Sequence, residues 1–421
     1  MNMRFDRRQF MAGAAALSAF AASGCSRSSD KVEMWAMGNE AAALPELLRI
    51  LHTKSAIPPV SVQPLPWSAA HEKLLTGFAG GSLPTLSQVG NSWIAELAAI
   101  GAIEPVPGAQ AGLLTDQFDA VIDTCRIGNK IWAVPWYVDT RVQFYRRDLF
   151  AKAGYAAPPP RWDDWKVALQ QVKRVAGKGN YGVLMPVNEY EHLTTIALSA
   201  KADMLNTERT QGAFSEPEFL EALAFYKSLF DEGLAPLASA TQISNVWNEF
   251  ARGYFSVYPS GPWTIGDMQT RLPKAFQDKW ATAPNPGPDG AGSAAPGGSS
   301  LVVFRGAANA DQAWSVVNAL LGPQGQAALQ KLSGDLPARK AAWGSSAADN
   351  PHINAFARQL DLARALPKVP EWERIVTEMQ VVAERMLRGQ FTVRQAAAEM
   401  DVRANRLLEK RRWMVAKGRA L

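Results

Sequence analysis

The sequence predicts an α/β protein organised as two domains or as one large two-lobed body. Strand and helix patterns alternate from residue 32 to residue 79, which indicates βαβ units around a parallel sheet. The folded part runs from about Lys31 to Leu421, a length that exceeds one ordinary domain. Apolar residues make up 47% of the chain, enough for a large core.

Each element is predicted from hydrophobic periodicity and from the residues that end it. The first strand ends at Gly38, and the helix after it carries Leu44, Leu47, Leu48 and Leu51 on one face. Pro, Gly, Ala and Ser dominate 283–300, which is therefore expected to be a loop. The expected strands are 32–37, 60–65, 85–90, 131–134, 142–145 and 301–304, and the expected helices are 41–51, 67–79, 93–100, 162–175, 217–232, 245–252, 310–321 and most of 371–414, with a break at Gly389.

The N-terminus has the pattern of an export signal. A basic segment with Arg4, Arg7 and Arg8 precedes an uncharged run, 10–24, that is too short to span a bilayer. Asp6-Arg7-Arg8-Gln9-Phe10-Met11 resembles a twin-arginine motif, and Ala22-Ser23-Gly24-Cys25 resembles a lipobox. We therefore expect a signal peptide at 1–24, lipidation at Cys25 and a polar tether at 25–30.

Charge and cysteine content exclude several classes of protein. The formal charge is +5, and removal of 1–24, with three Arg and one Asp, leaves 5 − 2 = +3, which is too weak to suggest nucleic-acid binding. Once Cys25 is acylated, Cys125 is the remaining thiol, so no intramolecular disulfide is expected. The four histidines are scattered, and we expect neither a metal site nor a cofactor.

Six short segments, in order along the chain, resemble the carbohydrate-binding family of ABC-importer solute receptors, the group that includes maltose- and trehalose-binding proteins. The strongest is WAVPWYVDT at 132–140 followed by YRRDLF at 145–150, where Arg146 departs from the family's usual asparagine. The other five are WSAAHEKL at 67–74, GNSW at 90–93 with GAIEP at 101–105, GY at 253–254 with GPW at 261–263, GGSS at 297–300 and LPAR at 336–339.

This resemblance implies a two-lobed periplasmic-binding-protein fold, in which each lobe is a mostly parallel sheet flanked by helices and a ligand cleft lies between the lobes. The expected N-lobe is 31–137 plus 298–336, and the expected C-lobe is 142–288 plus 342–421. Crossovers are expected near 137–142, 288–298 and 336–342. The implied partners are a small carbohydrate, the transmembrane subunits of an ABC permease and the membrane through Cys25, and the chain is expected to act as a monomer without catalysis.

Candidate ligand-binding residues follow strands or lie on crossovers. Asp139 matches a family carboxylate that accepts hydrogen bonds from sugar hydroxyls, although a salt bridge to Arg141 is the competing interpretation. Trp263 matches the family's stacking tryptophan. Residues that end or follow the first three strands are expected at the carboxyl edge of the sheet, where α/β proteins bind ligands: Asn39, Glu40, Trp67, Asn91 and Trp93.

The remaining candidates are predicted from a nearby crossover, from the residues beside them or from the resemblance. Trp136 adjoins the first crossover, and Trp372 falls where some relatives have a second stacking aromatic. Ser299 follows glycines that permit close approach of a ligand. Arg339 offers a fork of donors, although a structural ion pair is the competing role. Asn188, Glu189 and Tyr190 lie where relatives present an aromatic from the second lobe.

Two other functions stay open on the sequence alone. One is a receptor of the same fold for a polyamine or a glycerol phosphate. The other is an exported carbohydrate-active enzyme, which requires a pair of carboxylates flanking the glycosidic bond. The sequence contains 14 tryptophans, which suit stacking on sugar rings, and the candidate residues include two carboxylates and one arginine. This combination favours a neutral, polyhydroxylated ligand.

Overall fold

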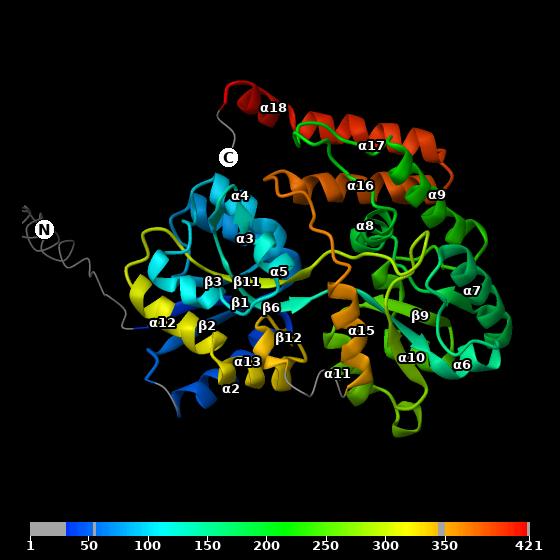
Figure 1. Cartoon of the computed structure of the whole chain (residues 1–421), viewed down its shortest axis with the longest axis horizontal. Helices are drawn as coiled ribbons and strands as arrows, with labels where there is room; N and C mark the ends of the chain where they lie inside the picture. Colours follow the sequence, from blue (N-terminus) through cyan, green and yellow to red (C-terminus); the bar gives the residue numbers. More distant parts are fainter. Residues whose placement is uncertain (1–30, 54–55, 344–349, 419–421) are drawn as a thin grey trace, which may run out of the picture.

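The computed structural model describes residues 31–53, 56–343 and 350–418 and contains two α/β lobes that lie side by side (Figure 1). The first lobe holds a six-stranded sheet in the order β12-β6-β11-β3-β1-β2, and the second holds a four-stranded sheet in the order β10-β7-β9-β8. A separate two-stranded sheet, β4-β5, completes the strands. Their bounds are β1 (Val32–Met37), β2 (Val60–Leu65), β3 (Leu86–Gly90), β4 (Arg126–Ile127), β5 (Lys130–Ile131), β6 (Val134–Asp139), β7 (Val142–Arg146), β8 (Tyr181–Val183), β9 (Phe255–Ser260), β10 (Trp280–Ala283), β11 (Gly297–Val303) and β12 (Leu336–Pro337).

The α/β class is confirmed, but the expectation of mostly parallel sheets is wrong. Only β1–β2, β1–β3 and β8–β9 pair in parallel among the named strands of the two main sheets; the other pairs are antiparallel. The reason is the route of the chain. Strands β3 and β6 end at the edge facing the second lobe, whereas β11 enters the sheet at that edge after returning from the second lobe. Strand β11 must therefore be antiparallel to both of its neighbours, β3 and β6.

Helices cover both sheets (Figure 1). In α2 the leucine face predicted from the sequence is buried, because all four leucines pack into the core of the first lobe. The helices of this lobe are α2 (Gly38–His52), α3 (Trp67–Ala79), α4 (Ile94–Ala99), α5 (Asp119–Thr124), α12 (Ala310–Leu321) and α13 (Pro323–Ser333). Those of the second lobe are α6 (Arg147–Lys152), α7 (Trp162–Ala176), α8 (Tyr190–Ser199), α9 (Pro217–Asp231), α10 (Val246–Arg252), α11 (Trp263–Arg271), α15 (Pro351–Leu360), α16 (Trp372–Leu387), α17 (Val393–Leu407) and α18 (Glu409–Ala416).

Two connections between the main sheets are tied together by hydrogen bonds. Only Thr140 and Arg141 separate β6 from β7, and residues 284–296 separate β10 from β11. The Thr140 hydroxyl donates to the Ala295 carbonyl at 3.1 Å, and the Asn285 amide donates to the Arg141 carbonyl at 2.6 Å. The predicted loop 283–300 is shorter than expected, because β11 begins at Gly297. The limits of the lobes along the chain stay a prediction.

Cys125 lies in the core of the first lobe and is fully buried. Its Sγ lies 3.1 Å from the Ser300 hydroxyl, and burial raises the pKa of the thiol to about 11. Cys25 and the export segment lie outside the described residues. In the part of the chain that the structure describes, no helix is both long and apolar enough to cross a membrane.

Candidate functional site

A cavity of about 580 Å³ lies between the two lobes, and both contribute to its walls. This volume is within the range of sites for small molecules. We call this cavity the cleft. It is lined from the first lobe and the crossovers by Gly38, Asn39, Glu40, Trp67, Gly90, Asn91, Ser92, Trp93, Tyr137, Asp139, Arg141, Ala295, Pro296, Gly297 and Gly298, and from the second lobe by Tyr190, Glu191, Thr194, Trp263 and Leu366.

The turn after β1 brings polar groups to the cleft because Gly38 permits an unusual backbone. Its φ is +63°, and an added Cβ would lie 2.6 Å from Glu40 Oε2 and 2.7 Å from Trp67 Nε1. Both the conformation and the crowding exclude larger side chains. The tight turn therefore places Asn39 and Glu40 beside Trp67.

Two tryptophans form an aromatic wall on the first lobe. The rings of Trp67 and Trp93 meet edge to face, with centroids 5.5 Å apart. Trp93 is held from behind by His71, whose ring stacks on it at 5.0 Å. Trp67 is 38% exposed, whereas Trp93 is 7% exposed. Trp67 thus offers the larger free surface to a ligand.

Two buried carboxyl groups, Glu40 and Asp335, interact on this side of the molecule, and Glu40 lines the cleft. Burial raises the pKa of both, and the charge of Glu40 raises the pKa of Asp335 further. The Tyr137 hydroxyl also interacts with Glu40 and accepts a hydrogen bond from the Gln88 amide at 3.4 Å. Two neighbouring buried carboxyls cannot both ionise readily, because the charge on one raises the pKa of the other.

Asp139, at the end of β6, lies at the floor of the cleft. Burial raises the pKa of its carboxyl to about 6, although the charge of Arg141 acts in the opposite direction. The Gly298 backbone also donates a hydrogen bond to this carboxyl. Arg141 forms its ion pair with Glu191, at 3.6 Å, and not with Asp139, the partner in the competing interpretation. Asp139 is therefore a poorly neutralised carboxylate that faces the cavity.

The second lobe presents Trp263 at the start of α11. The Arg141 guanidinium lies 4.9 Å from the centroid of its ring, a cation–π contact that holds the ring in place. The hydroxyls of Ser260 and Thr264 lie 2.7 Å apart and fix the turn that carries the tryptophan. Trp263 thus faces the cleft from the side opposite Trp67 and Trp93.

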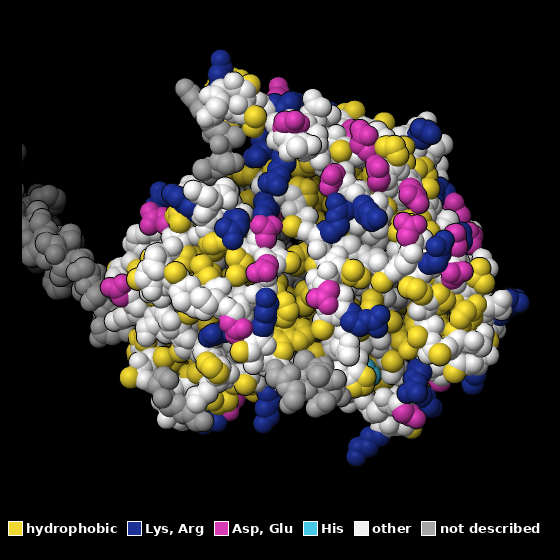
Figure 2. Space-filling view, in the orientation of Figure 1, with side chains coloured by type: hydrophobic (Ala, Val, Ile, Leu, Met, Phe, Trp, Pro, Cys, Tyr) yellow, Lys and Arg dark blue, Asp and Glu magenta, His cyan; other side chains and the backbone are white. Residues whose placement is uncertain are grey.

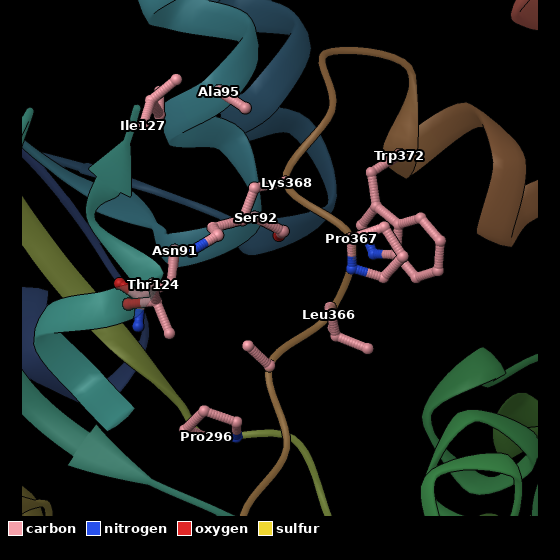
Figure 3. A pocket seen from close by; sticks show the side chains of 11 residues that line it. Asn91, Ser92, Ala95, Thr124, Ile127, Pro296, Leu366, Pro367, Lys368 and Trp372 are labelled. Carbon is pink, nitrogen blue, oxygen red and sulfur yellow. The ribbon is translucent and has the colours of Figure 1, made fainter. Parts of the chain in front are cut away.

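A small side cavity of about 40 Å³ adjoins the cleft and shares Asn91, Ser92, Pro296 and Leu366 with it (Figure 3). Asn91 is fixed there: its oxygen accepts from the Ser300 hydroxyl at 2.7 Å, and its amide donates to the Gly297 carbonyl at 3.4 Å. Lys368 crosses between the lobes, and its Nζ lies 2.8 Å from the Asp123 carboxylate. This ion pair therefore links the segment before α16 to the first lobe beside the cleft.

Seven of the candidates from the sequence line the cleft: Asn39, Glu40, Trp67, Asn91, Trp93, Asp139 and Trp263. Tyr190, from the looser second-lobe segment, lines it too, whereas the Asn188 side chain accepts a hydrogen bond from the Ala240 backbone instead.

Four candidates do not line the cleft. Trp136 is fully buried in the first-lobe core, because its side chain points to the other face of β6 from Tyr137 and toward the helices. Ser299 is buried within the paired strand β11. The Arg339 guanidinium lies 3.7 Å from the Asp116 carboxylate, so Arg339 forms a structural ion pair, its competing role. Trp372 is 1% exposed in the second-lobe core and borders only the side cavity.

Several residues that line the cleft were not predicted from the sequence. Tyr137 and Trp136 are neighbours on β6, and neighbouring side chains of a strand point to opposite faces of the sheet. This alternation could have indicated Tyr137 as a cleft residue. Arg141 was considered only as a partner of Asp139. Glu191 and Thr194 lie on α8, which was not predicted, and Leu366 lies in the segment before α16. In the described part of the chain, no group of three or more His, Cys, Asp and Glu side chains is arranged to hold a metal ion.

Charge does not favour a polyanionic partner on the face shown in Figure 2, where basic and acidic side chains are intermixed. This agrees with the weak net charge of the sequence.

Comparison with known proteins identifies the family. The family model for bacterial extracellular solute-binding proteins matches residues 53–355. The structure of the sugar-binding protein MalE from Xanthomonas citri is similar over 92% of this chain and 99% of that chain, with 41% identity and a TM-score of 0.85.

Two sequence relatives agree with this result. A binding protein of Brucella abortus is 29% identical over 318 residues, 74% of this chain and 76% of the relative. The diacetylchitobiose-binding protein DasA of Streptomyces coelicolor is 22% identical over 310 residues, 73% and 72% of the two chains. The chain therefore belongs to the bacterial extracellular solute-binding protein family and has its two-lobed fold.

Proposed function

We propose that the protein is the substrate-binding lipoprotein of an ABC importer and captures a small carbohydrate, a disaccharide or short oligosaccharide of the maltose or trehalose kind. The observation that carries this proposal is the cleft itself, in which Trp67 and Trp93 face Trp263 across a floor that contains Asp139. Aromatic faces cover the apolar faces of sugar rings, and carboxylates accept hydrogen bonds from hydroxyls. The similarity to a sugar-binding protein at 41% identity supports it.

The charges around the cleft favour a neutral ligand over an anionic one. Among the described residues that line the cleft, Arg141 is the one Arg or Lys, and it is already engaged by Glu191 and Trp263. A glycerol phosphate would meet the carboxylates of Asp139 and Glu191 without a free cation to balance them. A sugar hydroxyl instead supplies a further donor to Asp139, beside the Gly298 backbone.

Binding is coupled to hinge closure in this proposal. A ligand that contacts Trp67 on one lobe and Trp263 on the other makes all its contacts only when the lobes are close, so it shifts the population toward a closed form. The short connection at 140–141 lies between the sheets and suits a hinge. The closed form would then be recognised by the transmembrane subunits of the permease, without any chemical change to the sugar.

The location follows from the N-terminal segment. Export, by the twin-arginine route if that motif is used, followed by acylation of Cys25 would anchor a monomer to the membrane on the periplasmic side, with the tether before β1 leading into the first lobe.

The test is a thermal-shift screen of the purified protein against mono- and oligosaccharides, polyamines and glycerol phosphates, followed by titration calorimetry on each hit. A ligand present at ~100 times its Kd stabilises the folded form by ~2.7 kcal/mol. Stabilisation by one class of sugar supports the proposal. Stabilisation only by spermidine or glycerol 3-phosphate would reject the sugar, and turnover of a glycoside would reject the receptor.

A polyamine receptor is the second candidate, because Glu40, Asp139 and Glu191 line the same cavity as the tryptophans. Carboxylates and aromatic faces together suit an organic cation. The raised pKa of Glu40 weakens this case, since a protonated carboxyl lacks the negative charge that a polyamine would need.

A further inference from the structure

The segment 361–371, which connects α15 to α16 of the second lobe, also contacts the first lobe (Figure 3). We call this segment the strap. Its Val369 is fully buried in the second-lobe core, and Leu366 packs against the same core. The Arg364 guanidinium lies 3.4 Å from the Asp203 carboxylate, which follows α8 of that lobe. The strap is therefore fixed to the second lobe and must move with it.

From the strap, the Lys368 side chain extends to the first lobe. Its Nζ lies 2.8 Å from the Asp123 carboxylate and donates to the Asp123 carbonyl at 3.0 Å. Asp123 lies near the end of α5, flanked by the fully buried Val121 and Cys125, and Cys125 belongs to the first-lobe core. One ammonium group thus joins the two lobes.

A second polar contact joins the lobes nearby. Glu373, in the first turn of α16, accepts a hydrogen bond from the Ser92 hydroxyl of the first lobe, and the charge of His71 from the same lobe acts on it. Helix α16 begins directly after the strap, so both contacts require the same placement of the second lobe. Opening the lobes about the connections 140–141 and 284–296 would separate both pairs.

The ion pair lies outside the cleft. Neither Lys368 nor Asp123 is among the described residues that line the cleft. Lys368 borders the side cavity, whose volume of about 40 Å³ is far below the range of small-molecule sites. A ligand in the cleft therefore does not need to contact either partner, and the pair acts on binding through the position of the lobes.

We propose that the Lys368–Asp123 pair is a latch that stabilises the closed form, so that the affinity for a neutral ligand of the cleft depends on ionic strength. Closing forms the pair and opening breaks it, so a ligand that selects the closed form gains what the pair contributes to closure. Salt screens the pair but has no charge to screen on a neutral sugar. The inference rests on the proposed function, because it assumes closure on a ligand. Lys368 is a positioning residue.

The exposure of the pair determines the size of the effect. The side chain of Lys368 is 19% exposed and that of Asp123 is 45% exposed, so we expect the pair to change the ratio of closed to open molecules about threefold. Arg126 also lies 3.8 Å from Asp123, but both belong to the first lobe. That contact is the same in the open and closed forms and does not act as a latch.

The test is titration calorimetry with maltose at about 20 mM and about 500 mM NaCl. Wild type should bind about twofold more weakly at the higher salt concentration. Lys368→Gln should bind about threefold more weakly than wild type at low salt and show no salt dependence, whereas Lys368→Arg should keep both properties of wild type. The matched control is Lys166→Gln, because the Lys166–Glu232 pair, at 2.7 Å, lies within the second lobe. This control should behave like wild type.

A double-mutant cycle isolates the pair. Lys368→Gln and Asp123→Asn together should cost about threefold, as each does alone, and not about ninefold. Losses that multiply, or a salt dependence that persists in Lys368→Gln, would reject the latch and leave the sugar receptor in place. A melting temperature for each variant shows whether a loss reflects unfolding. If Lys368→Gln unfolds, Asp123→Asn must remove the salt dependence instead.

A measurement without ligand separates this inference from the proposed function. Small-angle X-ray scattering gives the radius of gyration of the unliganded protein, which should rise with salt in wild type and be larger at low salt in Lys368→Gln. If wild type does not bind maltose, the maltose-type function fails and scattering decides on the latch. Equal radii for wild type and Lys368→Gln at both salt concentrations would then reject it.

Discussion

The first-lobe wall of the cleft is built largely from strand ends and the residues that follow them, whereas the second-lobe wall comes mainly from two helices, α8 and α11. Asn39, Asn91 and Asp139 each follow or end a strand of the six-stranded sheet. Glu191 and Thr194 come from α8, and Trp263 begins α11. The walls also differ in charge. In the first, burial raises the pKa of the carboxyls of Glu40 and Asp139, whereas in the second Glu191 forms an ion pair with Arg141 at 3.6 Å.

This difference suggests separate roles for the two walls. A preorganised, poorly neutralised wall discriminates among ligands, because it leaves polar groups unpaired when a hydroxyl is missing. A wall whose charges are already satisfied adds contact area when the lobes approach. We therefore expect variants of the first wall to change specificity and pH dependence, and variants of the second to change affinity for all ligands.

The largest effect expected is on stability, from a residue just behind the first wall. Trp136→Ala should lower the free energy of unfolding by about 3–5 kcal/mol, because a fully buried indole leaves a cavity in the core. Urea unfolding measures this loss. Ligand affinity of the remaining folded protein should change little, and a strong loss of affinity with normal stability would mean that Trp136 faces the cleft after all.

The next largest effect is expected on ligand affinity, for a residue of the second-lobe wall. Trp263→Ala should weaken binding of every sugar by roughly 30-fold, or about 2 kcal/mol, as expected for a central aromatic anchor. Calorimetry with the sugar found in the screen measures it. Trp67→Ala is the matched variant on the first wall, and a loss there that is uniform across sugars would contradict the division of roles.

Asp139 should give a smaller, pH-dependent effect. Its pKa of about 6 lies above the unfolded value of 3.8, so the buried carboxylate lowers stability progressively as the pH rises from about 4 to about 6. Asp139→Asn should thus raise the free energy of unfolding by about 1 kcal/mol at pH 7 while weakening sugar binding about tenfold.

The same group should make binding pH-dependent in the wild-type protein. If only the carboxylate form accepts the ligand hydroxyl, affinity at pH 5 should be about tenfold lower than at pH 7.5, given the pKa of about 6. Calorimetry at both values measures this ratio, and Asp139→Asn should abolish it. A ratio that persists in the variant would assign the titration to Glu40 and Asp335.

The smallest effect is expected for Arg339→Ala. Its partner Asp116 lies 3.7 Å away at a partly exposed site, so the free energy of unfolding should fall by about 0.2–1 kcal/mol and affinity should not change. A measurable loss of sugar binding would restore Arg339 as a site residue.

The sequence predicted the first lobe better than the second for a physical reason. The strands 32–37 and 60–65 and the helix 67–79 match β1, β2 and α3, because consecutive βαβ units have strong local periodicity. Helix α8, strand β9 and strand β10 were missed, since each carries apolar residues on more than one side or is too short for a period to show. The direction of β11 depends on where the chain re-enters the first-lobe sheet, and a local sequence pattern does not predict that point.

The same reasoning explains the site. Residues after parallel strands share an edge, so Asn39, Asn91 and Asp139 could be grouped from sequence order. Trp136 and Tyr137 are neighbours on one strand and point to opposite faces, and choosing between them requires knowing which face packs on helices. The partnership of Glu40 with Asp335 joins residues far apart in the sequence and follows only from the fold.

Because the Cys125 thiol is buried, the hinge motion of this protein can be followed with dyes attached to other, engineered cysteines. A thiol that is fully buried and has a pKa of about 11 is almost entirely protonated at neutral pH, so it should resist maleimide reagents while the protein is folded. With Cys25 removed, two engineered surface cysteines, one on each lobe, could then be labelled selectively with a donor and an acceptor dye. The wild-type background is thus suited to recording hinge closure by energy transfer, one molecule at a time.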